Sequence, residues 1–367
     1  MQPLPVSLAK EPYPIDEHAK AFCEAFAAPS AKRYVFGRNA YAQSIAEAFD
    51  VTAFIDDFTQ DREYLGKPIV KSDQVPSDAL VVSIVIGKPF VAEKRLKQFS
   101  FRFLDYFAFA RYSQNSRIAP VKFWNEFRAD FETNRAQYAW LLERLHDDES
   151  KETLSRIIHF RLSHDLNFMR GFTDAQHRQY FEDFLELKSA GESFADVGSF
   201  DGYTSEYFVK QCPEYTAVHA FEPEPKNMVI VKQRLAAFPR IHYYQHGLSN
   251  ASQVLRFDPS GSCSKISEAG DLEIKVERLD DVLHDVLHDR LTFVKMDIEG
   301  AERPALEGAK QTILQHYPRL ALSVYHLFDD LWQIPRQVLS YRDDYDLYVR
   351  HYTEGVDETV MFFIPKR

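Results

Sequence analysis

Short apolar runs alternate with amphipathic segments over the first third of the chain. The runs have the length and the β-branched content of buried strands, and a segment between the first two has the apolar spacing of a helix. Strands that alternate with helices predict a parallel sheet covered by helices. We therefore expect a small α/β domain over residues 1–120. The strand-like runs are residues 33–37, 51–57, 66–70 and 80–87, and the helix-like segment is residues 39–49.

Residues 121–187 show a different pattern, in which aromatic residues recur every three or four positions. This spacing puts the aromatic side chains on one face of a helix. Such stripes serve packing far more often than ligand binding. We therefore expect a helical connector over residues 121–187, followed by a second α/β domain over residues 188–367. The recurring aromatic residues are Phe123, Trp124, Phe127, Phe131, Tyr138 and Trp140.

A strand, a glycine turn and a helix start follow one another at residues 194–205. Gly198 and Gly202 suit a sharp turn that a ligand can approach, and Thr204 is placed to cap the helix. Glu222 ends the next strand, 20 residues after Gly202 (222 minus 202), and doubly wound folds present an acid to ribose hydroxyls at this separation. The pattern predicts an adenosine site. The simpler alternative is a glycine turn with an ordinary surface glutamate.

The turn lacks the third glycine of the dinucleotide fingerprint, because Ser199 and Phe200 leave only G-x-x-x-G. A dinucleotide needs bare backbone and a helix N-terminus for its pyrophosphate. S-adenosylmethionine has no phosphate and instead presents an ammonium and a carboxylate. Asp196 and Asp201 suit that ammonium, so the turn favours S-adenosylmethionine over a nicotinamide cofactor.

A second polar block stands at the end of a later strand, at residues 291–302. Strand alternation puts Lys295 and Asp297 on one face, and Pro304 fits the first turn of the following helix. Ligands bind at the carboxyl edge of open α/β sheets. We expect the cation and the anion to lie together at this edge.

In these motifs the chain resembles the FkbM-type methyltransferases, over about residues 177–367. The resemblance implies a Rossmann-like class I methyltransferase sheet, mostly parallel with a terminal antiparallel hairpin, and S-adenosylmethionine as the cofactor. The matching segments are Asp196-Val-Gly-Ser-Phe-Asp-Gly202, Phe221-Glu-Pro-Glu-Pro-Lys-Asn227, Lys295-Met-Asp-Ile-Glu-Gly-Ala-Glu302 and Ser323-Val-Tyr-His326.

The resemblance also implies further site residues. In this class the exit of the third strand passes near the adenine, which here corresponds to Gly247 and Leu248. The segment 177–187 tends to cover the cofactor pocket, so Tyr180 is expected to contact the cofactor or the substrate. His326 ends the fifth strand and is expected to adjoin the centre of methyl transfer.

Methyl transfer to an alcohol needs alignment and removal of a proton. His326 is the first candidate base because imidazole titrates near neutral pH; a histidine bonded within the sheet edge is the alternative. Asp297, beside Lys295, holds that imidazole or is itself the base. Glu299 and Glu302 could instead bind Mg²⁺, although acids in the first turn of a helix commonly serve its dipole. We therefore assign no metal.

The N-terminal domain is predicted to be a second Rossmann-like unit, because it also has a glycine after a strand and an acid at the end of the next strand. Asp56 falls 19 residues after Gly37 (56 minus 37), which mimics a nucleotide-binding arrangement. A single glycine is a weak signal, so we favour a structural or partner-binding role for this domain over ligand binding.

Composition narrows the class of protein. The net charge of -11 disfavours binding to nucleic acid, which requires a basic face. The three cysteines form no C-x-x-C pair, which argues against a disulfide framework or a zinc site. We expect neither a targeting segment nor a membrane span, because no apolar run is long enough, and by default a cytoplasmic location.

Together these features predict an S-adenosylmethionine-dependent O-methyltransferase that acts on a hydroxyl of a sugar or a glycosylated metabolite. N-methylation, a nucleoside acceptor and assembly into a homo-oligomer stay open. An NAD(P)-dependent sugar oxidoreductase or epimerase would need the missing glycine and a Tyr-x-x-x-Lys pair. A non-catalytic nucleotide-binding scaffold is disfavoured because Asp196, Gly198, Glu222 and Asp297 all stand in register.

Overall fold

The chain forms two compact units in the computed structural model, which describes residues 13–258, 265–266, 272–284 and 290–366. Residues 121–187, expected as a helical connector, contribute to both units. The N-terminal unit holds residues 1–135, 152–175 and 352–357, and the C-terminal unit holds residues 136–151, 176–351 and 358–367.

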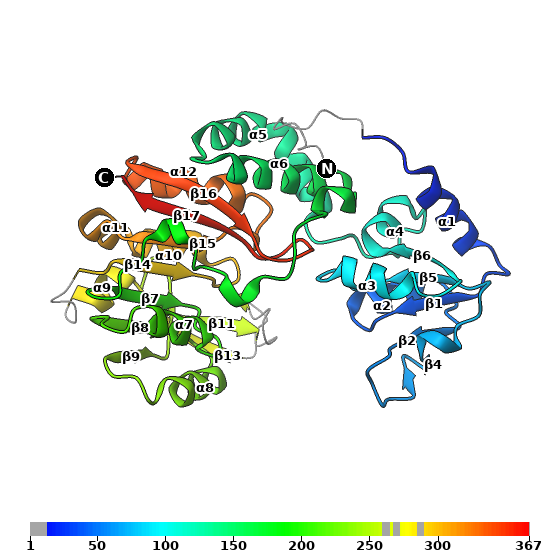
Figure 1. Ribbon diagram of the computed structural model, residues 1–367, viewed down its shortest axis with the longest axis horizontal. Helices are drawn as coiled ribbons and strands as arrows, with labels where there is room; N and C mark the ends of the chain where they lie inside the picture. The colour runs from blue at the N-terminus through cyan, green and yellow to red at the C-terminus, as the bar shows by residue number, and fades with distance from the viewer. Residues whose placement is uncertain (1–12, 259–264, 267–271, 285–289, 367) are drawn as a thin grey trace. The chain divides into compact units, whose positions relative to one another are not determined.

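A six-stranded sheet in the order β3-β4-β2-β1-β5-β6 organises the N-terminal unit (Figure 1). All neighbouring strands are parallel except β3, which pairs antiparallel with β4. The bounds are β1 (Arg33–Phe36), β2 (Ala53–Ile55), β3 (Glu63–Tyr64), β4 (Lys67–Val70), β5 (Leu80–Ser83), β6 (Arg102–Asp105), α1 (Glu17–Ala27), α2 (Ala40–Ala48), α3 (Pro89–Leu96) and α4 (Tyr106–Tyr112).

Apolar side chains on both faces of these strands explain why helices cover both faces of the sheet. Val35 and Phe54 pack with α1, α2 and α4, whereas Tyr34 and Ile55, one residue away along the strands, pack with α3 on the opposite face. Successive side chains of a strand point to opposite faces, so this sheet needs helices on both sides. The predicted small α/β domain is confirmed.

Two long helices, α5 (Trp124–Arg144) and α6 (Asp148–Ser163), confirm the helical prediction for the middle of the chain. The aromatic stripe of α5 serves packing, since Phe127, Phe131 and Tyr138 are all buried. Asn134 departs from helical geometry and kinks α5.

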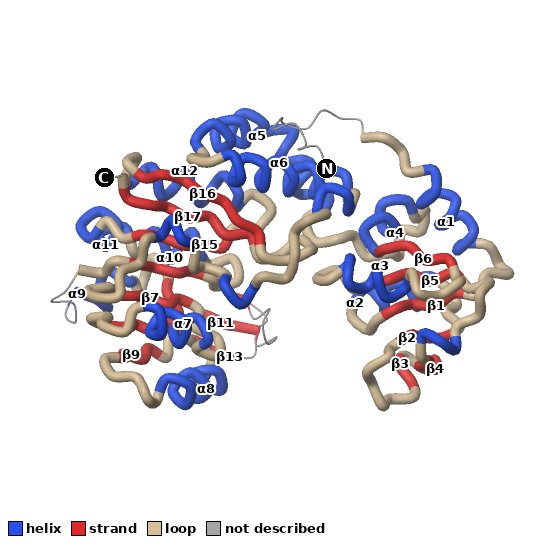
Figure 2. Tube along the Cα trace, viewed as in Figure 1, coloured by secondary structure: helices blue, strands red, loops and turns tan. Residues whose placement is uncertain are grey.

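A seven-stranded sheet in the order β16-β17-β15-β14-β7-β8-β9 forms the core of the C-terminal unit. The strands from β15 to β9 are parallel, and β16 and β17 form the expected antiparallel hairpin. Figure 2 shows these strands in red with blue helices around them. The bounds are β7 (Ser193–Val197), β8 (Ala217–Phe221), β9 (Ile241–Tyr244), β14 (Phe293–Met296), β15 (Arg319–Ser323), β16 (Tyr345–His351) and β17 (Thr359–Pro365).

The central strands β7 and β14 are buried at every position, as expected for parallel strands covered on both faces. Their carboxyl ends therefore lie at one edge, where the polar motifs begin. The helices of this unit are α7 (Tyr203–Gln211), α8 (Pro225–Leu235), α9 (Leu279–His284), α10 (Glu302–Gly308), α11 (Lys310–His316) and α12 (Asp330–Tyr341), with 3₁₀ turns at Gln176–Arg178 and Asp183–Leu185.

A second, four-stranded sheet in the order β10-β13-β11-β12 belongs to the same unit and was not predicted. Gly247 and Leu248, expected as a turn, form its strand β10 and pair with β13. The polar segment 260–265, which the sequence suggested as a lid or a surface hairpin, lies almost wholly outside the described residues. The bounds are β10 (Gly247–Leu248), β11 (Gln253–Asp258), β12 (Lys265–Ile266) and β13 (Leu272–Glu277).

Candidate active site

A cavity of about 360 Å³ lies at the carboxyl ends of the central strands of the C-terminal unit. Ligands bind at this edge in open α/β sheets. The cavity brings together most of the predicted site residues, but Asp196, Gly202 and His326 do not line it. The predicted residues that do line it are Tyr180, Gly198, Asp201, Thr204, Glu222, Gly247, Leu248, Lys295, Asp297 and Glu299.

The turn after β7 requires glycine at two positions. Gly198 and Gly202 have φ angles of +82° and +80°, a region that side chains with a Cβ rarely adopt. A Cβ at Gly198 would also overlap the carbonyl oxygen of Asp297. Gly198 thus permits β7 and β14 to approach closely at the point where both strands end.

The helix after this turn begins differently from the prediction. Gly202 is the N-cap of α7 and, as a glycine, offers no side chain to cap the helix. The prediction that Thr204 caps it is wrong, because Thr204 already lies within the first turn. Thr204 instead lines the cavity.

Glu222 directly follows β8 and lines the cavity, where two backbone N–H groups hold its side chain. Its Oε2 accepts the N–H of Phe200 at 2.9 Å, and its Oε1 accepts the N–H of Glu224 at 2.9 Å. Burial raises the pKa of Glu222, and these backbone donors oppose that shift. The side chain fixes the glycine turn while its remaining lone pairs can accept hydroxyl groups.

Lys295 and Asp196 form an internal ion pair below the turn. They are paired residues of β14 and β7, and Lys295 Nζ lies 3.2 Å from Asp196 Oδ1. Lys295 Nζ also donates to the carbonyl oxygen of Gly198 at 2.5 Å, and Ser205 donates to Asp196 at 2.7 Å. Because Asp196 is fully buried, the pair supports the turn from beneath.

Asp201 lines the cavity but already has a cationic partner. Arg234 of α8 donates to its carboxylate at 2.7 Å, and the N–H of Tyr203 donates to it at 2.9 Å. Its side chain is 35% exposed, so the carboxylate remains accessible to a ligand beside this ion pair.

Asp297 is held in the cavity by hydrogen bonds from two tyrosines. The hydroxyl of Tyr180 donates to its Oδ2 at 2.6 Å, and the hydroxyl of Tyr325 donates to its Oδ1 at 3.3 Å. Burial acts to raise the pKa of Asp297, but His326 and Lys295 outweigh burial and lower it. Asp297 is therefore ionised at neutral pH and oriented by two phenols.

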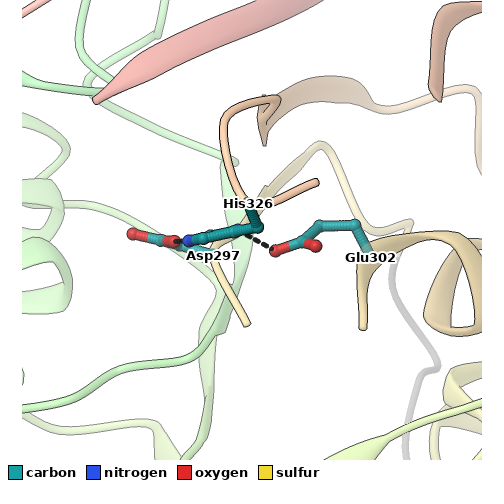
Figure 3. Close-up of side chains that lie close together, drawn as sticks. All are labelled: Asp297, Glu302 and His326. Atoms are coloured by element: carbon teal, nitrogen blue, oxygen red, sulfur yellow. Dashed lines mark hydrogen bonds and ion pairs between the residues drawn. The ribbon is translucent and has the colours of Figure 1, made fainter. Parts of the chain in front are cut away.

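His326 lies behind Asp297, between two carboxylates (Figure 3). Its Nδ1 is 2.8 Å from Glu302 Oε1 and its Nε2 is 3.2 Å from Asp297 Oδ1. Burial acts to lower the pKa of His326, but Glu302, Asp297 and Glu299 outweigh it and raise the pKa to about 10. At neutral pH this side chain is an imidazolium, which has no lone pair with which to accept a proton.

Glu302 closes the loop that follows β14. Its two carboxylate oxygens accept the N–H groups of Ile298 at 2.8 Å and Gly300 at 3.0 Å. The loop needs such support because Glu299 and Gly300 have φ angles of +57° and +96°. Glu302 is buried, and its carboxylate stabilises the backbone of this loop.

Asp297, Glu302 and His326 lie close enough together to hold a metal ion. Mg²⁺ prefers oxygen ligands and retains several waters, whereas here both oxygens of Glu302 already accept backbone N–H groups and the third candidate ligand is an imidazole. The donor set does not fit Mg²⁺, so no step of the chemistry below uses a metal.

Among the cavity residues that the sequence did not predict are Gln179 and Glu358, and the role of Tyr325 was only partly predicted. Gln179 donates to Glu358 at 2.6 Å, and the same Glu358 oxygen lies 3.3 Å from the Tyr325 hydroxyl, whose single proton Asp297 and Glu358 share. Glu358 precedes β17 and has a φ angle of +70°, which is strained for a glutamate. The sequence marked Tyr325 only as polar, and no motif surrounds Gln179 or Glu358.

The seven-stranded sheet, its terminal hairpin and this cavity define a class I methyltransferase fold. Residues 196–352 match the family model of the methyltransferase FkbM domain. The matched region is similar to the methyltransferases of the FkbM family, and the chain is a methyltransferase.

Two known proteins are similar to larger parts of the chain or to its structure. It is 21% identical over 190 residues to the 2-O-methyltransferase NoeI of Sinorhizobium fredii, which covers 45% of this chain and 76% of that protein. The crystal structure of methyltransferase FkbM from Methylobacillus flagellatus superposes with a TM-score of 0.72 and 21% identity, covering 95% of this chain and 98% of the other. The similarity to this crystal structure includes residues of both units.

Within the described residues, none of the helices has both the length and the apolar character that crossing a bilayer requires.

Proposed function

We propose that this methyltransferase transfers the methyl group of S-adenosylmethionine to a hydroxyl of a sugar or a glycosylated small molecule. The observation that carries the proposal is the position of Glu222 beside the bare turn at Gly198, in the same cavity as Asp297. The cofactor, when bound, supplies an electrophilic methyl group. A cytoplasmic location and assembly of identical chains remain predictions.

The residues present fit the cofactor. Glu222 is an acid that can accept ribose hydroxyls, and Gly247 and Leu248 line the same cavity. Asp201 is accessible to an ammonium group. Because a Cβ at Gly198 would overlap Asp297, the glycine keeps the turn compact where the ligand and Asp297 meet.

The charge of the residues that line the cavity favours S-adenosylmethionine over a nicotinamide cofactor. Lys295 is the single Lys or Arg among the described residues that line the cavity, and it is paired with Asp196. A pyrophosphate would therefore meet carboxylates without a free cation, whereas a sulfonium would be attracted by them. The lining carboxylates are Asp201, Glu222, Glu224, Asp297, Glu299 and Glu358.

We assign the role of base to Asp297 and a positioning role to His326. Asp297 lines the cavity and is held by Tyr180 and Tyr325, so an acceptor hydroxyl can donate to it in a fixed direction. His326 does not reach the cavity, and its positive charge keeps Asp297 ionised and in place. The proton of the acceptor hydroxyl passes to Asp297.

Transfer to a hydroxyl is supported by NoeI, whose name states 2-O-methyl transfer, and the excess of carboxylates in the lining disfavours an anionic acceptor. Isothermal titration with S-adenosylhomocysteine, NAD and a UDP-sugar tests the cofactor. Assays of label transfer from methyl-labelled S-adenosylmethionine to neutral methyl glycosides, amines and nucleosides test the acceptor. Binding of NAD alone would overturn the proposal, and transfer to amines only would replace O- by N-methylation.

Replacement of Glu222 by Ala is expected to weaken S-adenosylhomocysteine binding by about 1–3 kcal/mol, because ribose hydroxyls lose a charged acceptor. Isothermal titration measures the change. Glu214→Ala, which alters an acid outside the cavity, is the matched control and should bind normally. An unchanged affinity of Glu222→Ala would place the ribose elsewhere.

Replacement of Asp297 by Asn is expected to lower turnover by about 10²–10⁴-fold, the usual contribution of a general base. Affinity for S-adenosylhomocysteine should stay near that of the wild type, because the shape of the side chain is kept. Label transfer to the best acceptor of the panel measures turnover. Asp281→Asn, at an exposed acid of the same unit, is the control; normal turnover in Asp297→Asn would remove Asp297 as base.

A further inference from the structure

The N-terminal unit contains a cavity of its own, of about 330 Å³. It lies at the carboxyl ends of β5 and β6, where Ser83 and Asp105 end the strands. The beginning of α1, the helices α3 and α4, and the segment after α6 complete the walls. In open α/β sheets this edge is where ligands bind.

The first turn of this sheet, where a nucleotide would be expected, is already filled by the protein. Arg38 donates to Asp56 at 2.9 Å and to Asp61 at 2.8 Å. The carboxylate of Asp56 also accepts the N–H groups of Phe58 and Thr59. The carboxylate that resembled a ribose acceptor therefore serves its own loop, and the cavity at β5 and β6 is a different place.

Acids outnumber bases in the lining of this cavity. Glu93 and Arg170 neutralise each other through two hydrogen bonds of 3.1 Å. Three carboxylates, those of Asp16, Asp105 and Asp165, then face one further guanidinium, that of Arg111, which donates to the carbonyl oxygen of Ser163. The charge of Arg170 also acts on Asp165 and Asp105. The lining therefore has four carboxylates, those of Asp16, Glu93, Asp105 and Asp165, against the two guanidinium groups of Arg111 and Arg170.

Asp105 and Asp165 are close enough to affect each other. Burial raises the pKa of Asp105 to about 6, and the charge of Asp165 adds to this shift. Asp105 accepts the N–H of Ala108 at 3.0 Å and Asp165 accepts the N–H of Asn167 at 2.9 Å, so both side chains are fixed in place. Two fixed carboxylates beside a cavity attract a cation.

His164 adds an independent observation. Its side chain lines the cavity and is only 4% exposed, and its Nδ1 has no hydrogen-bond partner among the described residues. Burial, together with Arg111 and Arg128, lowers the pKa of His164 to about 3, so the ring is neutral. Buried polar atoms without a partner are rare in folded proteins, and a donor from a ligand would supply one.

We propose that this cavity is a second small-molecule site, which binds a protonated amine through Asp105, Asp165 and His164. An ammonium group offers three donors, and its charge would offset the excess of carboxylates. The apolar walls formed by Leu96, Phe103 and Leu166 suit a carbon skeleton behind the amine. The same acids disfavour phosphorylated ligands. This site is separate from the methyltransferase cavity and does not depend on the proposed function.

The test compares cyclohexylamine with cyclohexanol, which differ in the charged group but share the ring, by isothermal titration of the full chain at pH 7. The amine should bind at least about tenfold more tightly, because charge-assisted hydrogen bonds are worth more than neutral ones. Asp105→Asn and Asp165→Asn should each weaken amine binding by about tenfold or more. Asn still caps a helix, so both variants should keep the fold.

Asp78→Asn is the matched control, since Asp78 is an exposed acid of the same unit that pairs with Lys32, and it should bind the amine as the wild type does. Unfolding midpoints of all variants verify the fold, and Asp165→Asn carries the test if Asp105→Asn does not fold. Equal binding of amine and alcohol would overturn the proposal. Wild-type amine affinity in both cavity variants would do so as well.

Discussion

Gly198→Ala should destabilise the C-terminal unit by about 2–5 kcal/mol and abolish detectable binding of S-adenosylhomocysteine. Two effects add up. A φ angle of +82° costs a residue with a Cβ about 1–2 kcal/mol. The Cβ would also overlap the carbonyl oxygen of Asp297, and overpacking of this kind costs about 1–3 kcal/mol. Urea unfolding and isothermal titration measure the two outcomes.

Gly191→Ala separates the two effects. Gly191 precedes the same strand and has a φ angle of +80°, but a Cβ there meets no atom within 4 Å. This control should lose only the conformational part of the stability and should keep its affinity for the cofactor product. If Gly198→Ala behaved like Gly191→Ala, the close approach of β7 and β14 would not be needed for the site.

Local features of the sequence predicted most of the fold and the glycine turn. The strands β1, β5, β7 and β15 were found because each is an apolar run next to a glycine, a turn or a polar motif. Gly198 and Gly202 were found because a turn between a strand and a helix needs positive φ angles. In these cases the physical cause lies within a few residues of the pattern.

Contacts between distant segments account for what the sequence could not show. Tyr180, Tyr325 and Glu358 meet around Asp297 from three parts of the chain. Asp196 was expected to face a ligand, but strand pairing sets it against Lys295, inside the fold. The small sheet around β10 was missed because its two-residue edge strands are too short to give a pattern.

The protonation state of His326 also could not be predicted from the sequence. A histidine at a strand end suggested a base, since the free side chain titrates near pH 6.5. Three carboxylates surround it in the structure, and two of them come from the loop after β14, in which Glu299 has a left-handed conformation. The charge on a side chain thus depends on neighbours that only the fold brings together.

His326→Gln should lower the free energy of unfolding at pH 7 by about 3–5 kcal/mol, because it leaves Glu302 and Asp297 close together without their buried cation. The wild type should also lose stability in alkali. A folded pKa of about 10 lies above the unfolded value, so the contribution of His326 is complete below pH 6.5 and disappears as the pH rises through 10. Urea unfolding between pH 7 and pH 10 measures this loss, which His326→Gln should not show.

His219→Gln is the control with the opposite sign. Burial lowers the pKa of His219 to about 4, so this neutral histidine stabilises the fold above pH 6.5 and its contribution is lost in acid, as the pH falls toward 4. Its replacement should leave the alkaline slope of the wild type unchanged. If His326→Gln kept that slope too, the imidazole would be neutral in the folded protein, and the role of base would return from Asp297 to His326.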